Sequence, residues 1–123
     1  MKIAYLAGPM MPRGNRSDTQ NAAIEYLFNV RDMLAAAVVL IGKGYAPYCP
    51  ALDMQYFLSL RPGEMISEEI IKDVSIAFLE NSDILVLLPG WEVSAGCKAE
   101  YSKAVELGMP AYYDVKSVPE GKI

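Results

Sequence analysis

The chain has 123 residues, 53% of them hydrophobic, and a formal net charge of −4. This length and apolar content fit one domain with its own core. The acidic balance and the scattered lysines and arginines argue against duplex nucleic acid as a partner, because that partner needs a basic face. The sequence has no histidine and only two cysteines, which excludes common zinc sites and Ser-His mechanisms, so any catalysis would use carboxylates, tyrosine or, less readily, cysteine or lysine.

The first part of the chain predicts two strands and a long helix. "KIAYLAG" (Lys2 to Gly8) is a short apolar run closed by Gly-Pro, which is typical of a buried strand. The "SDTQ" segment from Ser17 resembles a capping box and predicts a helix that runs to Gly42. A weaker strand is predicted at 45–49, and its prolines favour an edge position.

The middle of the chain predicts a loop, a helix and a central strand. Residues 50–63 are expected to form a loop with one helical turn, and residues 64–81 form an amphipathic helix. "DILVLLP" (Asp83 to Pro89) is apolar throughout, as a strand covered on both faces should be.

The last part predicts a helix from Ser94 to Gly108 and a strand over 111–115. We therefore expect a single domain over 1–115 and a loose C-terminal tail over 116–123. Neither cysteine is in a CxxC pair and no secretory leader is evident, so a reduced, cytoplasmic protein is expected. The longest apolar run (33–41) is too short to span a bilayer, so no membrane partner is expected.

The alternation of strands and helices predicts an α/β fold. We expect an open, mainly parallel sheet of four or five strands in the order 2-1-3-4, with helices on both faces, as in flavodoxin-like or Rossmann-like folds. Such sheets bind ligands beyond the carboxyl ends of the strands where the strand order reverses. The loops that meet there are "GPMMPRGNRSD" (8–18) and "PGWEVSAG" (89–96).

Glu100 is the charge that does not fit its helix. Steps of about 100° per residue from Gly96 place Leu107 at about 20°, Glu100 at about 40° and Ala104 at about 80°, so Glu100 lies on the expected buried face. Its side chain leans toward residue 96, where glycine leaves open space, and the first-turn N–H groups suit an anion there. Glu100 is therefore either a functional carboxylate or a rim residue that reaches water or pairs with Lys103.

Other candidates flank this position. Tyr5 in the first strand is either a core residue or a group that holds Glu100. The first loop supplies candidates for ligand binding, and arginine suits phosphate: Gly8, Pro9, Met10, Arg13 and Arg16. Gln55 could read a base edge, and Trp91 could stack on a base or mark a subunit contact. On the helix over 64–81, either Asp73 or Ser75 could face the cleft.

These motifs carry a family resemblance. "YLAGP", "SDILVLLPGW" and the "SxGxxxE" spacing from Ser94 to Glu100 resemble the nucleoside 2-deoxyribosyltransferase-like superfamily, over residues 3 to about 112. The resemblance implies that Glu100 is the nucleophile at the anomeric carbon and that Tyr5 orients it. It also implies that Gly8, Ser94 and Gly96 surround the sugar's 5′ end and that Gln55 contacts the base.

Two positions refine what the resemblance implies. The serine at position 94 resembles the branch that cleaves nucleoside 5′-monophosphates. A neutral hydroxyl tolerates a phosphate there, whereas an aspartate would repel it. The family's catalytic aspartate lies eight residues before the aspartate that opens the third strand. In this sequence that strand opens at Asp83, so the expected position is occupied by Ser75. Either Asp73, two residues earlier, serves as the acid, or the acid is missing.

The expected function is therefore hydrolysis of the N-glycosidic bond of a nucleoside or 2′-deoxynucleoside 5′-monophosphate through a covalent glycosyl-glutamate. Neither a metal nor a redox cofactor is expected. The alternatives are a deoxyribosyltransferase that exchanges bases, a nucleotide-sugar or NAD-type glycohydrolase, and a binding protein that keeps the pocket without the chemistry.

The expected quaternary structure is a homodimer or a higher oligomer of dimers. The first helix is apolar over more than half a turn, which is wider than its own core requires, and the loop over 50–63 is rich in large apolar residues. The resemblance implies that relatives pair through such helices and complete each active site from a neighbouring chain. The alternative is a monomer that buries these residues in its own core.

Overall fold

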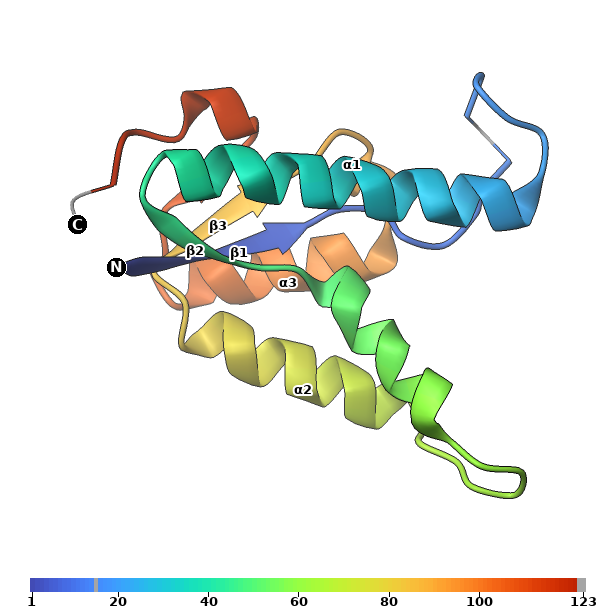
Figure 1. Cartoon of the computed structure of the whole chain (residues 1–123). Helices are drawn as coiled ribbons and strands as arrows, with labels where there is room; N and C mark the ends of the chain where they lie inside the picture. Colours follow the sequence, from blue (N-terminus) through green and yellow to red (C-terminus); the bar gives the residue numbers. More distant parts are fainter. Residues whose placement is uncertain (15, 122–123) are drawn as a thin grey trace.

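The computed structural model describes residues 1–14 and 16–121, apart from the side chain of Met54. Helices and strands alternate along the chain, joined by 3₁₀ segments labelled η (Figure 1). In chain order the elements are β1 (Lys2–Ala7), α1 (Ala22–Gly42), β2 (Tyr45–Tyr48), η1 (Pro50–Ser59), α2 (Glu68–Glu80), β3 (Ile84–Leu87), η2 (Trp91–Val93), α3 (Ala95–Glu106), β4 (Ala111–Tyr112) and η3 (Val115–Ser117).

The described strands form one parallel sheet in the order β2-β1-β3-β4. Tyr5 lies opposite Tyr48 of β2 and Leu85 of β3, so β1 and β3 are central. The predicted fold class and strand order are confirmed. β2 is an edge strand, as its Pro47 requires, since proline cannot donate a ladder hydrogen bond.

Alternate residues of the central strands feed two separate cores, which makes three layers. Ala4, Leu6, Ile84 and Val86 pack under α1. Their strand neighbours pack with α2 and α3 on the opposite face (Figure 1): Tyr5, Ala7, Leu85 and Leu87. Both strands are buried on each face, which explains why their sequences are apolar without alternation.

Two helices begin later than predicted. Helix α1 starts at Ala22 because the Asn21 side chain caps it, accepting from the N–H groups of Ala23 and Ile24. Helix α2 starts at Glu68, capped by Ser67. The predicted start at residue 64 is wrong because the Glu64 carboxylate instead closes a turn by accepting from the N–H of Arg61 at 2.7 Å.

Residues 50–59 form a ten-residue 3₁₀ helix, η1, where a loop with one helical turn was predicted. The segment begins with Pro50, which suits the first turn because its missing N–H is not needed there. In Figure 1, η1 runs away from the sheet and ends beside the start of α2. It carries Asp53 inward, where the carboxylate is 3% exposed.

The C-terminal segment packs on the domain, so the predicted loose tail is wrong as far as Gly121; residues 122–123 lie outside the described residues. The ammonium group of Lys43 donates to the carbonyl oxygens of Val115, Lys116 and Val118. Val118 is 2% exposed within the core under α1. A lysine that satisfies three carbonyls and a buried valine together hold this segment in place.

Candidate active site

A cavity of about 310 Å³ lies beyond the carboxyl end of β1, at the N-terminus of α3. It is the place where the strand order reverses between β1 and β3, as expected for this class of sheet. Six of the residues proposed from the sequence line it: Gly8, Met10, Arg13, Ser94, Gly96 and Glu100. The two predicted loops therefore converge on one cavity.

Glu100 reaches this cavity from the second turn of α3. Its pKa is raised from 4.5 to about 7, first by burial, which penalises the charged form. The nearby Asp53 charge raises it further, while the interaction with the Tyr5 hydroxyl lowers it. A carboxylate with this pKa changes charge near neutral pH, which is a property of groups at functional sites.

Tyr5 lies next to Glu100 in the floor of the sheet. Its ring is fully buried, and its hydroxyl has no hydrogen-bond partner among the described residues. Burial raises the pKa of Tyr5, and the neighbouring Glu100 carboxylate raises it further. The predicted pair is therefore adjacent, although no hydrogen bond joins the two groups in this structure. A buried hydroxyl that lacks a partner costs free energy, so its presence calls for an explanation.

The N-terminus of α3 opens onto the same cavity. The Ser94 hydroxyl oxygen accepts from the N–H of Cys97 at 3.3 Å, which leaves its own proton available to a ligand. A Cβ at Gly96 would have only the Ser94 hydroxyl within 4 Å, at 3.9 Å, so the space above this turn is open. First-turn N–H groups and the helix dipole favour a negative group there.

Two cations complete the polar lining. Arg13 comes from the loop after β1, and Lys72 comes from α2. Lys72 could not be predicted as a cavity residue, because only the placement of α2 against α3 brings it there. With the α3 N-terminus, these two cations suit a phosphate, and the carboxylates of Glu68 and Glu100 line the same cavity.

The cysteine alternative is disfavoured by its surroundings. Cys97 lines the cavity, but burial raises the pKa of its thiol to about 11. The thiol is therefore protonated at neutral pH and is a weak nucleophile. Glu100 is the better candidate to attack a substrate.

A buried carboxylate of α1, which could not be assigned a role from the sequence, binds the backbone of the loop that carries Arg13. Glu25 of α1 is 3% exposed and accepts from the backbone N–H groups of Arg13 and Gly14. At the start of the loop, a Cβ on Gly8 would lie 2.8 Å from Leu88, so only glycine allows this close approach. The only sequence signal for Glu25 was a carboxylate among apolar residues of α1.

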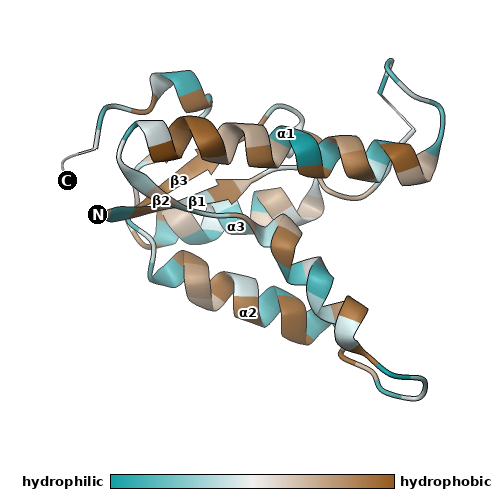
Figure 2. Cartoon of the chain, in the orientation of Figure 1, coloured by the Kyte–Doolittle hydropathy of each residue, from teal (hydrophilic) through white to brown (hydrophobic). Residues whose placement is uncertain are grey.

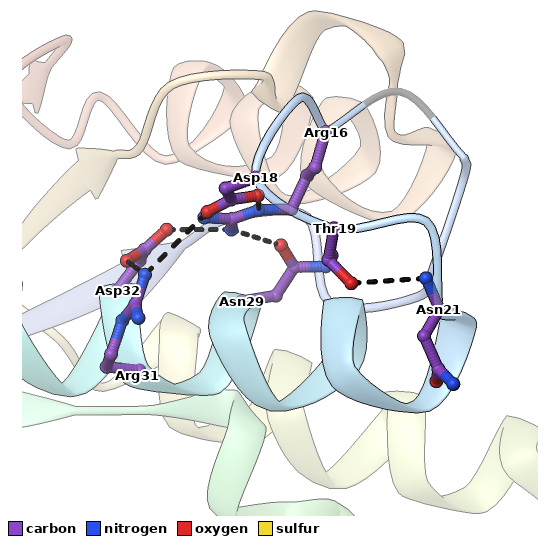
Figure 3. Close-up of polar contacts among 7 residues, drawn as sticks. All are labelled: Arg16, Asp18, Thr19, Asn21, Asn29, Arg31 and Asp32. Carbon is purple, nitrogen blue, oxygen red and sulfur yellow. Dashed lines mark hydrogen bonds and ion pairs between the residues drawn. The ribbon is translucent and has the colours of Figure 1, made fainter.

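Arg16 does not share the cavity with Arg13. Its guanidinium donates to Asp18 at 2.8 and 2.7 Å, to Asn29 at 2.9 Å and to Asp32 at 2.8 Å (Figure 3). Pro9 and Arg16 line a separate hollow of about 190 Å³. Because its donors are already used within the chain, Arg16 folds the loop onto α1 and is not placed to bind the same ligand.

Three other predicted residues also lie outside the cavity lining. Asp73 is exposed on α2, and Gln55 is exposed on η1. Trp91 packs in an aromatic cluster, with its ring centroid 5.0 Å from that of Tyr101 and 6.1 Å from that of Tyr113. The expectation that Asp73 serves as an acid in the cleft is therefore not met.

Ser75 is the α2 residue that faces inward. Its hydroxyl donates to Asp53 at 2.7 Å, and the Tyr48 hydroxyl lies 2.6 and 2.5 Å from the two Asp53 oxygens. Burial and this bond to Asp53 raise the pKa of Tyr48. Asp53 could not be placed from the sequence, because its burial depends on how η1 packs against α2.

Within the described residues, no group of three or more cysteine, aspartate or glutamate side chains could hold a metal ion. In the same part of the chain, no helix is long and apolar enough to cross a membrane.

Comparison with known families gives one result. The family model described as domain of unknown function (DUF4406) matches residues 1–113. The match covers the whole sheet and every residue of the cavity. No curated protein matches the chain.

Proposed function

The chain belongs to this family of unknown function, DUF4406, and we propose that it hydrolyses the N-glycosidic bond of a nucleoside or 2′-deoxynucleoside 5′-monophosphate. The observation that carries the proposal is the position of Glu100. Its carboxylate lies on a cavity, beside open space over Gly96 and on the same lining as the α3 N-terminus and the cations Arg13 and Lys72. A nucleotide needs these three features together: a nucleophile, room for the sugar, and a phosphate site.

The proposed reaction uses Glu100 as a covalent nucleophile. A carboxylate oxygen bonds to the anomeric carbon of the sugar as the N-glycosidic bond breaks, and the base departs with the bond's electron pair and takes up a proton. Water then cleaves the glycosyl ester, releases the sugar phosphate and regenerates the carboxylate. Because the pKa of Glu100 is about 7, the ionised form needed for attack becomes dominant above neutral pH.

The phosphate preference follows from the charges around the cavity. Arg13 and Lys72 supply two cations, and Ser94 supplies a neutral hydroxyl on the α3 N-terminus. A phosphate on the 5′ carbon would gain charge-assisted hydrogen bonds at this site. An unphosphorylated nucleoside would leave the same cations without a partner.

A panel of substrates tests the function. The protein is incubated with ribo- and deoxyribonucleoside 5′-monophosphates and with the matching nucleosides, and free base is measured by chromatography. Release of base from at least one monophosphate by the wild-type protein supports the proposal. No release from any compound would overturn it.

Two other functions are separated by the same panel. A deoxyribosyltransferase would form a new nucleoside when a second free base is added, at the expense of hydrolysis. A binding protein would retain a nucleotide without releasing base, and the position of Asp73 outside the cavity favours this alternative over the transferase.

We also propose that the protein forms a homodimer through α1. This helix leaves large apolar side chains exposed, among them Leu27 (61%), Val38 (67%) and Ile41 (58%). Figure 2 shows that hydrophobic segments recur along α1. Exposed apolar patches of this kind mark protein contacts. Sedimentation equilibrium at micromolar concentration should give twice the 13.5 kDa of one chain, and Val38→Asp should shift the protein toward the monomer. A wild-type species at 13.5 kDa would contradict the dimer.

The cytoplasmic location stays a prediction from the sequence. Cys49 and Cys97 are both free and buried, which supports a reduced compartment.

A further inference from the structure

Asp53 joins three elements of the fold through hydrogen bonds. Its carboxylate, in η1, accepts from the Tyr48 hydroxyl of β2, which lies 2.6 and 2.5 Å from its two oxygens. It also accepts from the Ser75 hydroxyl of α2 at 2.7 Å. Asp53 is 3% exposed, so these bonds are shielded from water and hold more firmly than surface bonds. They fix the position of η1 relative to both β2 and α2.

The rest of η1 has little else to hold it. The other described hydrogen bonds of η1 join residues within 49–60. Ala51 is buried in the core under α1, whereas farther along Tyr56 is 47% and Leu58 is 82% exposed. Figure 1 shows η1 running away from the sheet toward the start of α2. Asp53 is therefore the polar anchor of the outer half of η1.

η1 and α2 together supply one wall of the candidate cavity. This η1–α2 wall consists of Pro50 and Phe57 from η1 and of Glu68, Ile71 and Lys72 from α2. Phe57 is half-buried, and it is the only aromatic residue in the cavity lining that the structure describes. The segment that Asp53 anchors thus carries the single aromatic ring of the cavity.

The base of a nucleotide would lie against this wall. In the proposed function the phosphate lies at the N-terminus of α3, and the sugar lies over Gly96 beside Glu100. Those groups belong to α3, so the lining left for the base comes from η1, α2 and the chain around the end of β1. A flat base stacks well on an aromatic ring, and Phe57 provides that ring.

We propose that Asp53 is a positioning residue for the base: it holds η1 against β2 and α2 so that Phe57 can stack on the base of the substrate. This inference rests on the proposed function, which supplies the base. Asp53 acts through the wall and takes no part in breaking the glycosidic bond. Its loss should therefore weaken the binding of ligands that contain a base and spare those that lack one.

The experiment compares ligands with and without a base by isothermal titration calorimetry. The ligands are the four common 2′-deoxynucleoside 5′-monophosphates and 2-deoxyribose 5-phosphate, and the Glu100→Gln background prevents turnover. Asp53→Ala removes both bonds, Asp53→Asn keeps an acceptor oxygen, and Phe57→Ala removes the ring. The control is Tyr56→Ala, which removes the neighbouring aromatic ring of η1, exposed and outside the cavity lining. Circular dichroism confirms the fold of each variant.

Asp53→Ala should raise the Kd of the tightest-binding nucleotide by about five- to a hundredfold, as expected for a base that loses its stacking partner. The Kd of 2-deoxyribose 5-phosphate should change by less than about twofold. Phe57→Ala should give the same pattern, and the two losses should not add in the double variant, because both remove one contact. Asp53→Asn should lie between Asp53→Ala and the unaltered protein, and Tyr56→Ala should leave both Kd values unchanged.

A nucleotide Kd in folded Asp53→Ala that matches Tyr56→Ala would overturn the inference, as would an equal loss for the sugar phosphate or additive losses in the double variant. If Asp53→Ala does not fold, Ser75→Ala and Tyr48→Phe decide by the same comparison. Each removes one bond to Asp53, and Tyr48→Phe keeps the ring that stacks on Phe78 with centroids 4.4 Å apart.

The binding measurement also separates this inference from the proposed function. If the wild type releases no base while the nucleotide Kd still responds to Asp53→Ala as expected, the hydrolysis fails and the positioning role stands. If the wild type releases base and the nucleotide Kd does not respond, the hydrolysis stands and the positioning role fails. A wild-type protein that neither releases base nor binds any of the four nucleotides would overturn both.

Discussion

The polar groups on the two sides of the sheet differ in whether they have hydrogen-bond partners within the chain. Under α1, Glu25 accepts from two backbone N–H groups and Arg16 donates to three side chains, so these groups have their partners within the chain. Under α2 and α3, the Tyr5 hydroxyl has no partner among the described residues, and burial raises the pKa of Glu100. Satisfied polar groups fix a structure, whereas unsatisfied ones are held ready for a ligand. The polar groups on the α1 side are therefore structural, and the groups that lack partners lie at the candidate site on the α2 and α3 side.

Removing the nucleophile should give the largest effect. Glu100→Gln keeps the size and polarity of the side chain but cannot attack, so base release should fall by at least about a thousandfold. The measurement is free base released from the best monophosphate at saturating concentration, with circular dichroism to confirm the fold. A variant that keeps more than about a tenth of the wild-type rate would remove Glu100 from this role.

The next largest effect should distinguish Arg13 from Arg16, the two arginines of the first loop, by their influence on phosphate preference. Arg13→Ala removes a cation from the cavity and should lower kcat/KM for a monophosphate by about ten- to a hundredfold, with a smaller change for the matching nucleoside. The ratio of the two kcat/KM values measures phosphate preference. A ratio that stays at the wild-type value would place the phosphate elsewhere.

Arg16→Ala is the matched control, because it removes the same side chain three residues away. Its network with Asp18, Asn29 and Asp32 is exposed or partly exposed, so the loss should appear as lower stability of the loop and not as altered phosphate preference (Figure 3). An equal fall in phosphate preference for both arginine variants would break the distinction between the two faces.

The sheet could be predicted from the sequence because the signals that mark a strand are local. Apolar runs closed by glycine or proline mark strands whatever the rest of the chain does. Parallel strands bring their carboxyl ends to one edge, so the loops with Arg13 and Ser94 could be expected to meet, and the structure confirms that they do. Helical spacing alone placed Glu100 on the inward face of its helix.

Features that depend on tertiary packing were not predictable in the same way. Asp53 and Lys72 reach the site because η1 and α2 pack together beside α3, and nothing in their local sequence marks that placement. The start of α1 was misplaced because several capping residues occur between positions 17 and 21. Which of these residues caps the helix depends on how the preceding loop folds. Arg16 matched the composition of a phosphate loop, but Asp18 of the same loop and Asp32 of α1 take its donors.

The smallest effect concerns stability, and its sign differs between the two faces. The pKa of Glu100 is raised from 4.5 to about 7, mainly by burial, so the folded protein holds this proton more tightly than the unfolded chain. Between these two values the unfolded chain ionises first, and the free energy of unfolding therefore falls as pH rises through this window. Glutamine has no such proton. Glu100→Gln should thus be more stable than the wild type by about 1–3 kcal/mol at pH 8, and the gain should vanish near pH 4.

Glu25→Gln makes the same chemical change on the other face of the sheet, but it should lower the free energy of unfolding. Glutamine has one acceptor oxygen in place of two, and its NH₂ group opposes a loop N–H, so the variant should lose about 1–3 kcal/mol. Urea unfolding of both variants at pH 4, 6 and 8 measures the two effects together. If Glu100→Gln is destabilised at pH 8, its carboxylate is satisfied in the folded protein. The difference between the two faces would then disappear, because Glu100 would be a structural group like Glu25.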